Sequence, residues 1–292
     1  MNFEQLRALA AVVDEGTFEA AADWLHISPS AVSQRIKALE NAEGQILIRR
    51  GVPCSPTEPG AVLLRMARQM QLLEAEARET LGSQSPGLGT TRLAVNADSL
   101  ATWFLPVLTE AAAWTDTTLD LHIEDQEYSS RLLRQGDVMG AVTSDRIPAN
   151  GCRAVRLGAM RYVPAAAPAL RDRFAGAAGP DWDAMPVLQF NAKDDLQRGF
   201  LASRSTSGTP PMHTVPSSEA FLAAVRAGLG WGMVPELQVD SDFDDGRLVR
   251  LDASAHHDVV LYWQSWALQS KRLDRLTEAV RRAARQLRSQ PA

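Results

Sequence analysis

The stretch TFEAAADWLHISPSAVSQRIKALENAEG, residues 17–44, constrains the fold of this chain more than any other. Its apolar positions recur with a helical period over residues 18–25 and again after Ser28, which predicts two short helices joined by a tight turn. Thr17 and Ser28 are suited to cap these helices, and Pro29 stands at the first position of the second, where a missing N–H costs nothing. The pattern is typical of a helix-turn-helix.

The second predicted helix has an apolar face and a polar face. Val32, Ile36 and Leu39 share the apolar face because they are spaced at i, i+4 and i+7. Hydroxyl, amide and cationic groups on the other side can bind base edges and phosphates. In this stretch the candidate DNA contacts are Thr17, Ser28, Ser30, Ser33, Gln34, Arg35 and Lys37. A helical hairpin whose polar face meets only water has the same spacing, so the residues that follow must decide.

The segment after this hairpin, residues 45–57, reads QILIRRGVPCSPT. Apolar residues are followed by a pair of arginines and a turn rich in Gly and Pro. This order predicts a two-stranded wing with a basic tip beside the second helix. Arg49 and Arg50 are therefore further candidate DNA contacts.

The first 60 residues resemble the winged helix-turn-helix of the LysR-type transcriptional regulators. The run PSAVSQRIKALE followed by RRGVPCSPTEPG is most similar to the subgroup that controls exporters of basic amino acids, the ArgP- and LysG-like regulators. Ile48 departs from the family, which usually has Phe there, and this should alter the packing of the wing. The matching residues are Leu6, Leu9, Gly16, Thr17, Phe18, Ala20, Ala21, Leu25, Ser28 to Ser33, Gln34, Leu39, Glu40, Gly44, Leu47, Arg49, Thr57 and Gly60.

The resemblance implies an α+β protein of several domains. Residues 1–58 would form the winged helix-turn-helix, residues 59–82 a linker and dimerisation helix, and residues 83–91 a hinge. Residues 92–292 would form a two-lobed α/β effector domain that resembles type 2 periplasmic binding proteins. Its lobe I would hold residues 92–160 and 269–292, and its lobe II residues 161–268.

The residues support these divisions directly. Residues 58–81 keep a helical pattern that corresponds to a rod of about 36 Å. Its apolar seam needs a partner helix, which predicts a homodimer; the alternative is a helix that lies on its own domain. The seam consists of Val62, Met66, Met70, Leu73, Ala77 and Leu81.

Strand and helix patterns alternate after the hinge, which predicts α/β layers with largely parallel sheets. The expected strands are residues 92–96, 118–123, 138–143, 187–190, 213–215, 231–234 and 259–263, with crossings between the lobes near residues 160–165 and 263–270. The expected helices are residues 99–114, 128–134, 196–201, 218–227 and 271–287.

Charge and composition narrow the class of protein. The net charge is −5, and the first 88 residues carry more Asp and Glu than Lys and Arg, so a uniformly basic DNA-binding protein is excluded. The positive charge is local to the second helix and the wing. Two cysteines make a poor disulfide framework, and we find no signal peptide and no stretch of about 20 apolar residues. We therefore expect a cytoplasmic, nucleoid-associated protein without a membrane partner.

Candidate effector contacts lie where strands lead into helices, because ligands of open α/β sheets bind there. Hydroxyls at these junctions suit a carboxylate and acids suit a cation, and a basic amino acid presents both groups. The same residue types are also ordinary helix caps, worth about 1 kcal/mol without any ligand. The candidates are Asp98, Ser99, Glu124, Thr143, Ser144, Asp145, Ser217, Ser218 and Glu219.

Catalytic motifs are missing from the sequence. The adjacent His256 and His257 point to opposite sides of a strand, and no Cys has the spacing of a metal ligand. The glycines of residues 228–232 match neither a phosphate loop nor a dinucleotide fingerprint. We predict no enzyme activity, no cofactor and no metal. The histidines and tryptophans fit surface and core roles.

These observations predict a homodimeric or tetrameric regulator that binds double-stranded DNA, with RNA polymerase as a further partner. By the resemblance, its effector is lysine or arginine and its target an exporter gene, with a role as activator. Three alternatives stay open. They are a LysR-type regulator of another metabolite, an effector-independent nucleoid or replication-associated DNA-binding protein, and a solute-binding module that has lost DNA binding.

Overall fold

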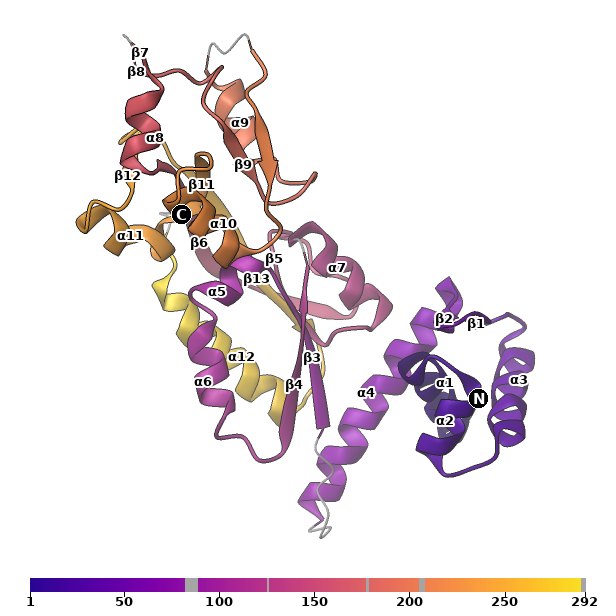
Figure 1. Ribbon diagram of the computed structural model, residues 1–292. Coiled ribbons are helices and arrows are strands. Elements are labelled where there is room, and N and C mark those ends of the chain that lie inside the picture. Colours follow the sequence, from indigo (N-terminus) through magenta and orange to yellow (C-terminus); the bar gives the residue numbers. More distant parts are fainter. Residues whose placement is uncertain (82–88, 125, 177–178, 205–207, 290–292) are drawn as a thin grey trace. The chain divides into compact units, whose positions relative to one another are not determined.

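A computed structural model describes residues 1–81, 89–124, 126–176, 179–204 and 208–289 (Figure 1). The chain forms two compact units, each made of three segments. The first unit holds Met1–Val95, Glu110–Val155 and Trp263–Glu278, and the second holds Asn96–Thr109, Arg156–Tyr262 and Ala279–Ala292. The proposed limits of the lobes stay a prediction. Most of the predicted hinge lies outside the described residues.

Three helices and a short wing form the N-terminal domain of the first unit. Both caps predicted from the sequence are made: Thr17 Oγ1 accepts a hydrogen bond from Ala20 N–H at 3.1 Å, and Ser28 Oγ accepts one from Ala31 N–H at 3.2 Å. The second helix ends at its C-cap residue, His26, which lies in the left-handed region with φ 54°. The elements are α1 (Phe3–Glu15), α2 (Phe18–Leu25), α3 (Pro29–Glu43), β1 (Ile48–Arg49) and β2 (Ser55–Pro56).

One core holds this domain together. Val32, Ile36 and Leu39, the predicted apolar face of α3, are each at most 1% exposed. Ile48 is buried in the same core, where the family usually has a larger Phe. Gly60 lies against the wing, and a Cβ at this position would overlap the carbonyl group of Leu47. The match at Gly60 therefore has a steric cause.

A single helix, α4 (Glu58–Thr80), follows the wing, one residue shorter than predicted. Thr57 caps it by accepting from Gly60 N–H at 3.1 Å. The predicted seam is largely exposed, with Val62, Met70, Leu73, Ala77 and Leu81 open to solvent. The opposite side, which includes Leu64, Ala67, Arg68 and Leu72, is buried against the chain itself. One face of α4 thus packs on its own chain, and the opposite, exposed face is available to a partner helix.

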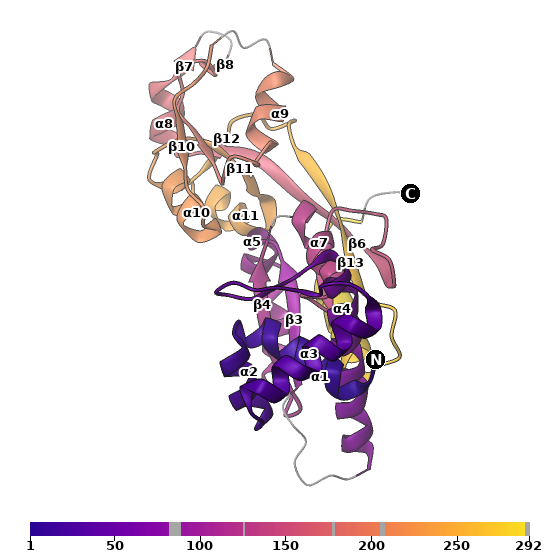
Figure 2. The ribbon, with the colours of Figure 1, turned by 90° about the vertical axis from the view of Figure 1, so that its right-hand side faces the viewer.

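Three neighbouring parallel strands lie in the first unit. β3 lies between β4 and β5 and is parallel to both, and β3 and β4 run side by side in both views (Figures 1 and 2). The strand β3 begins three residues before the predicted one and takes up residues 89–91 of the predicted hinge. The elements are β3 (Gly89–Val95), β4 (Thr117–Ile123), α7 (Gln126–Gln135) and β5 (Gly140–Thr143).

Two long strands, β6 and β13, each contain residues of both units. In the second unit β6 pairs antiparallel with β11 and β12, so the prediction of largely parallel sheets is only partly right. β9 and β10 are parallel to each other. The strands are β6 (Cys152–Ala166), β7 (Ala175–Gly176), β8 (Gly179–Pro180), β9 (Val187–Gln189), β10 (Met212–Thr214), β11 (Gly232–Pro235), β12 (Val249–Arg250) and β13 (His257–Trp266).

The predicted helix at residues 99–114 is wrong as one element. The chain forms two shorter helices there, because Thr102 has φ −126° and ψ −105°, which no helix tolerates. The closing helix also stops early, at Ala283, and a 3₁₀ turn (Ala284–Gln286) follows. The remaining helices are α5 (Ala97–Ala101), α6 (Leu105–Ala111), α8 (Pro168–Arg173), α9 (Leu196–Ala202), α10 (Ser218–Arg226), α11 (Glu236–Asp244) and α12 (Lys271–Ala283).

Most of the tryptophans predicted to be core residues are buried. Trp103, Trp231, Trp263 and Trp266 are fully buried. Within the described parts of the chain, no helix combines the length and apolar character that crossing a membrane requires. The described residues also contain no group of His, Cys, Asp and Glu arranged to hold a metal ion.

Candidate nucleic-acid interface and effector site

The outer face of α3 presents the polar groups that the sequence assigns to DNA. Ser30, Gln34 and Lys37 are exposed, and Ser33 is half-buried. Ser30 Oγ lies 2.9 Å from Ser28 Oγ, so the first turn of the helix carries two linked hydroxyls. Short side chains on a helix whose other face is buried suit insertion into a major groove, which admits an α-helix.

The cationic groups of this domain differ in how they are held. Lys37 and Arg49 are exposed, and Arg50 lies over the ring of Phe18 with 5.3 Å between its guanidinium carbon and the ring centroid. Arg35, in contrast, forms an ion pair with Glu4 of α1 at 3.0 Å. The guanidinium of Arg35 therefore fixes α3 to α1, and a phosphate would have to compete with Glu4 for it.

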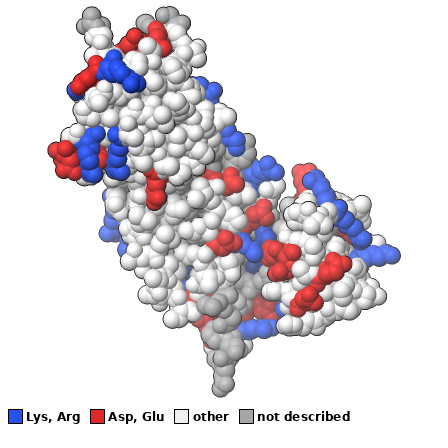
Figure 3. Space-filling model, in the orientation of Figure 1, with Lys and Arg blue, Asp and Glu red and all other residues white. Residues whose placement is uncertain are grey.

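The charge of the domain is segregated, as the sequence predicts. Blue side chains lie at the edge formed by α3 and the wing, and red ones lie over the rest of the domain (Figure 3). Because each phosphate neutralised releases counterions, a local basic edge can bind DNA on a protein whose net charge is −5.

The predicted effector contacts fall into two groups, one in each unit. Glu124, Thr143, Ser144 and Asp145 belong to the first unit, whereas Asp98, Ser99, Ser217, Ser218 and Glu219 belong to the second.

In the first unit the candidates satisfy the local backbone. Thr143 is fully buried, and its Oγ1 accepts from Asp145 N–H at 3.1 Å. Asp145 Oδ1 in turn accepts from Ile147 N–H at 2.9 Å. These bonds shape the turn after β5. Glu124 and Ser144 are half-buried.

In the second unit Asp98 is bound by two hydroxyl groups from distant parts of the chain. Its Oδ2 accepts from Tyr162 Oη at 2.9 Å, and its Oδ1 accepts from Ser218 Oγ at 2.8 Å. Tyr162 comes from β6 and Ser218 from the first turn of α10. Three elements thus meet at one carboxyl group.

The other candidates of the second unit are engaged in structure or exposed. Ser99 is fully buried, and its Oγ accepts from Trp103 Nε1 at 3.0 Å. Ser217 caps α10, and Glu219 is exposed. Of the two roles that the sequence allows for these residues, helix capping and ligand binding, Ser217 has the capping role in the structure.

Burial controls the protonation of this cluster. Burial raises the pKa of Asp98 above its ordinary value, although the hydrogen bonds from Ser218 and Tyr162 oppose the shift. The negative charge of Asp194 raises it further. Burial raises the pKa of Asp194 as well, and the pKa of the Tyr162 hydroxyl lies well above its ordinary value for the same reason. A cation bound beside Asp98 would favour the ionised form of its carboxyl group.

Three polar residues near Asp98 were not among the predicted contacts. Tyr162 lies in β6, and a hydroxyl at a predicted crossing between lobes is the signal that could have identified it. Asp194 lies between β9 and α9, at another strand-to-helix junction. Buried Asn96 precedes α5, and its Oδ1 has no hydrogen-bond partner among the described residues.

Comparison with known families agrees with this architecture. Residues 3–61 match the model of the bacterial regulatory helix-turn-helix protein, lysR family, and residues 85–288 match the model of the LysR substrate binding domain. The chain belongs to the LysR family of bacterial regulators, and it carries both the DNA-binding and the effector-binding parts of that family.

Relatives with known names cover the whole chain. The lysine export transcriptional regulatory protein LysG of Corynebacterium efficiens is 48% identical over 287 residues, which is 98% of each chain. The crystal structure of ArgP from Mycobacterium tuberculosis is 47% identical and covers 98% of each chain with a TM-score of 0.89. Full-length LysG of Corynebacterium glutamicum with bound effector Arg is 46% identical, covering 99% of this chain and all of that one, with a TM-score of 0.83.

Proposed function

We propose that this chain is a transcriptional regulator, not an enzyme, whose DNA binding responds to a basic amino acid, arginine or lysine. It acts in the cytoplasm on an exporter gene. The observation that carries the proposal is the half-buried carboxyl group of Asp98, bound by the hydroxyl groups of Tyr162 and Ser218, within a chain 46% identical to a regulator with bound arginine. An ammonium or guanidinium group would favour the ionised state of this carboxyl group.

Within this proposal Asp98 is the principal partner of the cation. Tyr162 and Ser218 would orient its carboxylate, because both donate hydrogen bonds to it. Backbone N–H groups at the start of α10, next to Ser217, would bind the carboxylate of the amino acid, since a helix N-terminus favours an anion. The first-unit candidates, Glu124, Thr143, Ser144 and Asp145, stay in the proposal as secondary contacts.

On the DNA side, Ser30, Ser33, Gln34 and Lys37 would contact base edges in the major groove, with Arg49 and Arg50 on the phosphate backbone. Thr17, Ser28 and Arg35 would act mainly by holding the surface in shape, because their side chains cap helices or pair with Glu4. The exposed seam of α4 would join two chains, and pairs of dimers would form a tetramer. RNA polymerase would be reached through the assembled complex.

A stability panel tests the effector part of the proposal. Thermal unfolding is followed with each of the twenty amino acids, dicarboxylates and aromatic acids. A ligand at about 100 times its dissociation constant adds roughly 2.7 kcal/mol if it binds only the native state. We expect shifts with arginine and lysine alone. Shifts with other compounds only would support a regulator of another metabolite, and a flat panel would support effector-independent DNA binding.

A further inference from the structure

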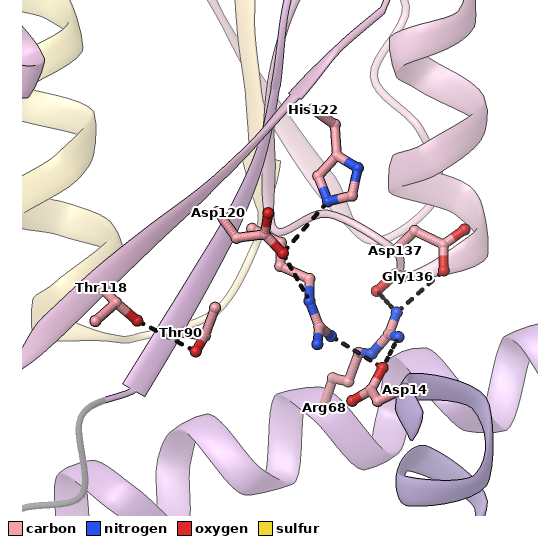
Figure 4. A network of polar contacts seen from close by, with 9 residues as sticks. Asp14, Arg68, Thr90, Thr118, Asp120, His122, Gly136 and Asp137 are labelled. Carbon is pink, nitrogen blue, oxygen red and sulfur yellow. Dashed lines mark hydrogen bonds and ion pairs between the residues drawn. The ribbon is translucent and has the colours of Figure 1, made fainter. Parts of the chain in front are cut away.

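A chain of charged side chains joins the winged domain to the effector-binding part of the first unit (Figure 4). At its centre, Arg68 of α4 donates through Nη1 to the carbonyl oxygen of Gly136 at 2.6 Å and to Asp137 Oδ1 at 3.1 Å. Its Nη2 donates to Asp14 Oδ1 of α1. One guanidinium group therefore binds both the DNA-binding domain and the turn after α7.

A second arginine, Arg92, binds the same carboxylate of Asp14. Arg92 of β3 donates through Nη1 to Asp14 Oδ1 at 3.1 Å, and its Nε lies 3.4 Å from Asp120 Oδ2 of β4. His122 Nε2 lies 3.5 Å from that same oxygen atom. Asp14 is the member of this network that comes from the winged domain.

Burial of Arg68 makes the loss of its partners unfavourable. The Arg68 side chain is 7% exposed and the Asp14 side chain 23% exposed. A buried cation that loses its partners is strongly unfavourable, so Arg68 is either paired in this contact or exposed to water after the two parts separate. The Arg68 guanidinium therefore favours two distinct arrangements of this contact, one closed and one separated, and disfavours intermediate ones.

The backbone at this contact is also closely packed. Gly136 has φ 77°, and a Cβ there would lie 2.6 Å from Arg65 Cβ and 2.7 Å from Arg65 Cα. Leu72, one turn beyond Arg68, belongs to the same buried cluster as Leu133 and Trp266. The turn after α7 therefore fits the surface of α4 only because residue 136 is glycine.

We propose that Asp14, Arg68 and the Gly136–Asp137 turn form a latch that transmits the state of the effector-binding part to the winged domain. Asp14 lies in the last turn of α1, which packs in one core with α2 and α3. Holding or releasing Asp14 therefore changes how freely α3, the proposed DNA-recognition helix, can move together with α1 and α2. The latch rests on the proposed function. An effector must favour either the closed or the released latch for effector binding to change DNA binding.

The first test measures the latch without any effector. Hydrogen exchange of the full-length chain is followed by mass spectrometry in peptides covering residues 8–16 and 133–140. We expect Arg68→Gln and Gly136→Ala to speed exchange in both peptides at least tenfold. Arg153→Gln is the matched control, because Arg153 pairs with Asp274 and the carbonyl of Leu268 without involving the winged domain. Unchanged exchange in both latch variants overturns the proposal, whatever effectors do.

The second test measures coupling. The ratio of DNA dissociation constants without and with 10 mM arginine is measured on a DNA fragment that the wild-type chain selects from a random library. We expect the same ratio for the wild type and Arg153→Gln, and a ratio at least threefold closer to one for Arg68→Gln and Gly136→Ala. An unaltered ratio in both variants, with arginine binding intact by calorimetry, overturns the latch.

A double variant separates the latch from mere destabilisation. If Asp14 and Arg68 act through each other, Asp14→Asn combined with Arg68→Gln changes the ratio no more than either change alone. Additive changes overturn the proposal. A wild type that neither binds arginine or lysine nor changes its DNA affinity with them counts against the proposed function, and hydrogen exchange then decides the latch by itself.

Discussion

The recognition surface of α3 and the carboxyl cluster of the second unit place functional groups in opposite environments. Ser30, Gln34 and Lys37 are exposed on a helix whose stability comes from its other face. Asp98, in contrast, is half-buried and accepts hydrogen bonds from Tyr162 and Ser218. The first surface can lose a functional group without losing its fold. At the second, burial opposes ionisation of the carboxyl group, and a bound cation would favour it.

This contrast follows from what each partner supplies. DNA brings a dense array of charges to the protein surface, so exposed groups on a rigid helix are sufficient. A small cation must be removed from water, and a carboxylate shielded from solvent can compensate for that loss by pairing with it. Substitutions at the two places should therefore affect stability and binding in different combinations.

The largest effect is expected for Asp98→Asn. It removes the carboxylate proposed to bind the cation, so we expect affinity for arginine, measured by calorimetry, to fall at least 100-fold. Because burial raises the pKa of Asp98, the charged form of its carboxyl group is less favourable in the folded chain than in the unfolded chain. We therefore expect the free variant to be about 1 kcal/mol more stable than the wild type.

Asp181→Asn provides the control for this result. Asp181 also belongs to the second unit, but its carboxylate accepts a hydrogen bond from Ala184 N–H in an exposed turn. Its removal should lower stability slightly and leave arginine affinity unchanged. An Asp98→Asn protein that binds arginine as tightly as the wild type would remove Asp98 from the effector site.

A smaller loss of binding, without gain in stability, is expected for Lys37→Ala combined with Arg49→Ala. Both side chains are exposed, so unfolding should change little, while DNA affinity should fall about 10- to 100-fold. In a dimer the slope of log affinity against log salt should decrease in magnitude by about 2 to 4. Fluorescence anisotropy between 50 and 200 mM salt measures both quantities.

The matched control for DNA binding is Arg171→Ala with Arg173→Ala. These residues lie on α8 in the second unit and change the net charge by the same amount. If this pair reduces the salt slope as much as the first, the basic edge of the winged domain does not determine DNA binding.

The winged domain was predictable because its determinants are local. The caps at Thr17 and Ser28, the proline at position 29 and the apolar spacing of α3 all act within four or five residues. Even the exposed seam of α4 follows from one helical period. The pairing of Arg35 with Glu4 could not be seen, because it depends on how α3 crosses α1.

The carboxyl cluster was only partly predictable because its determinants are distant. Asp98 was found from its place at a strand-to-helix junction, but its partners lie 64 and 120 positions along the chain. No local pattern indicates that Tyr162 and Ser218 meet there. The break at Thr102, which ends α5 early, was missed because residues 99–114 keep a helical composition.

A pH series should sharpen the contrast further. The pKa of Asp98 is raised in the free protein, and a bound cation would lower it again, so binding should release protons. Arginine affinity should therefore decrease as pH falls through the raised pKa, and Asp98→Asn should flatten this dependence. For the free protein the sign is opposite: the contribution of Asp98 to stability increases as pH falls toward its ordinary value. Calorimetry in two buffers with different ionisation enthalpies measures the protons released.

The smallest effect is expected for Glu4→Gln. Glu4 pairs with Arg35 at 3.0 Å, and the two side chains are 51% and 30% exposed, so the pair contributes only about 0.2–1 kcal/mol to stability. Releasing Arg35 and removing an acid beside the basic edge should tighten DNA binding about two- to fivefold. The control is Glu74→Gln, which breaks another Glu–Arg pair, with Arg78, and changes the net charge equally. Equal tightening in both variants would mean that overall charge acts, whereas weaker binding in Glu4→Gln alone would mean that DNA requires Arg35 held by Glu4.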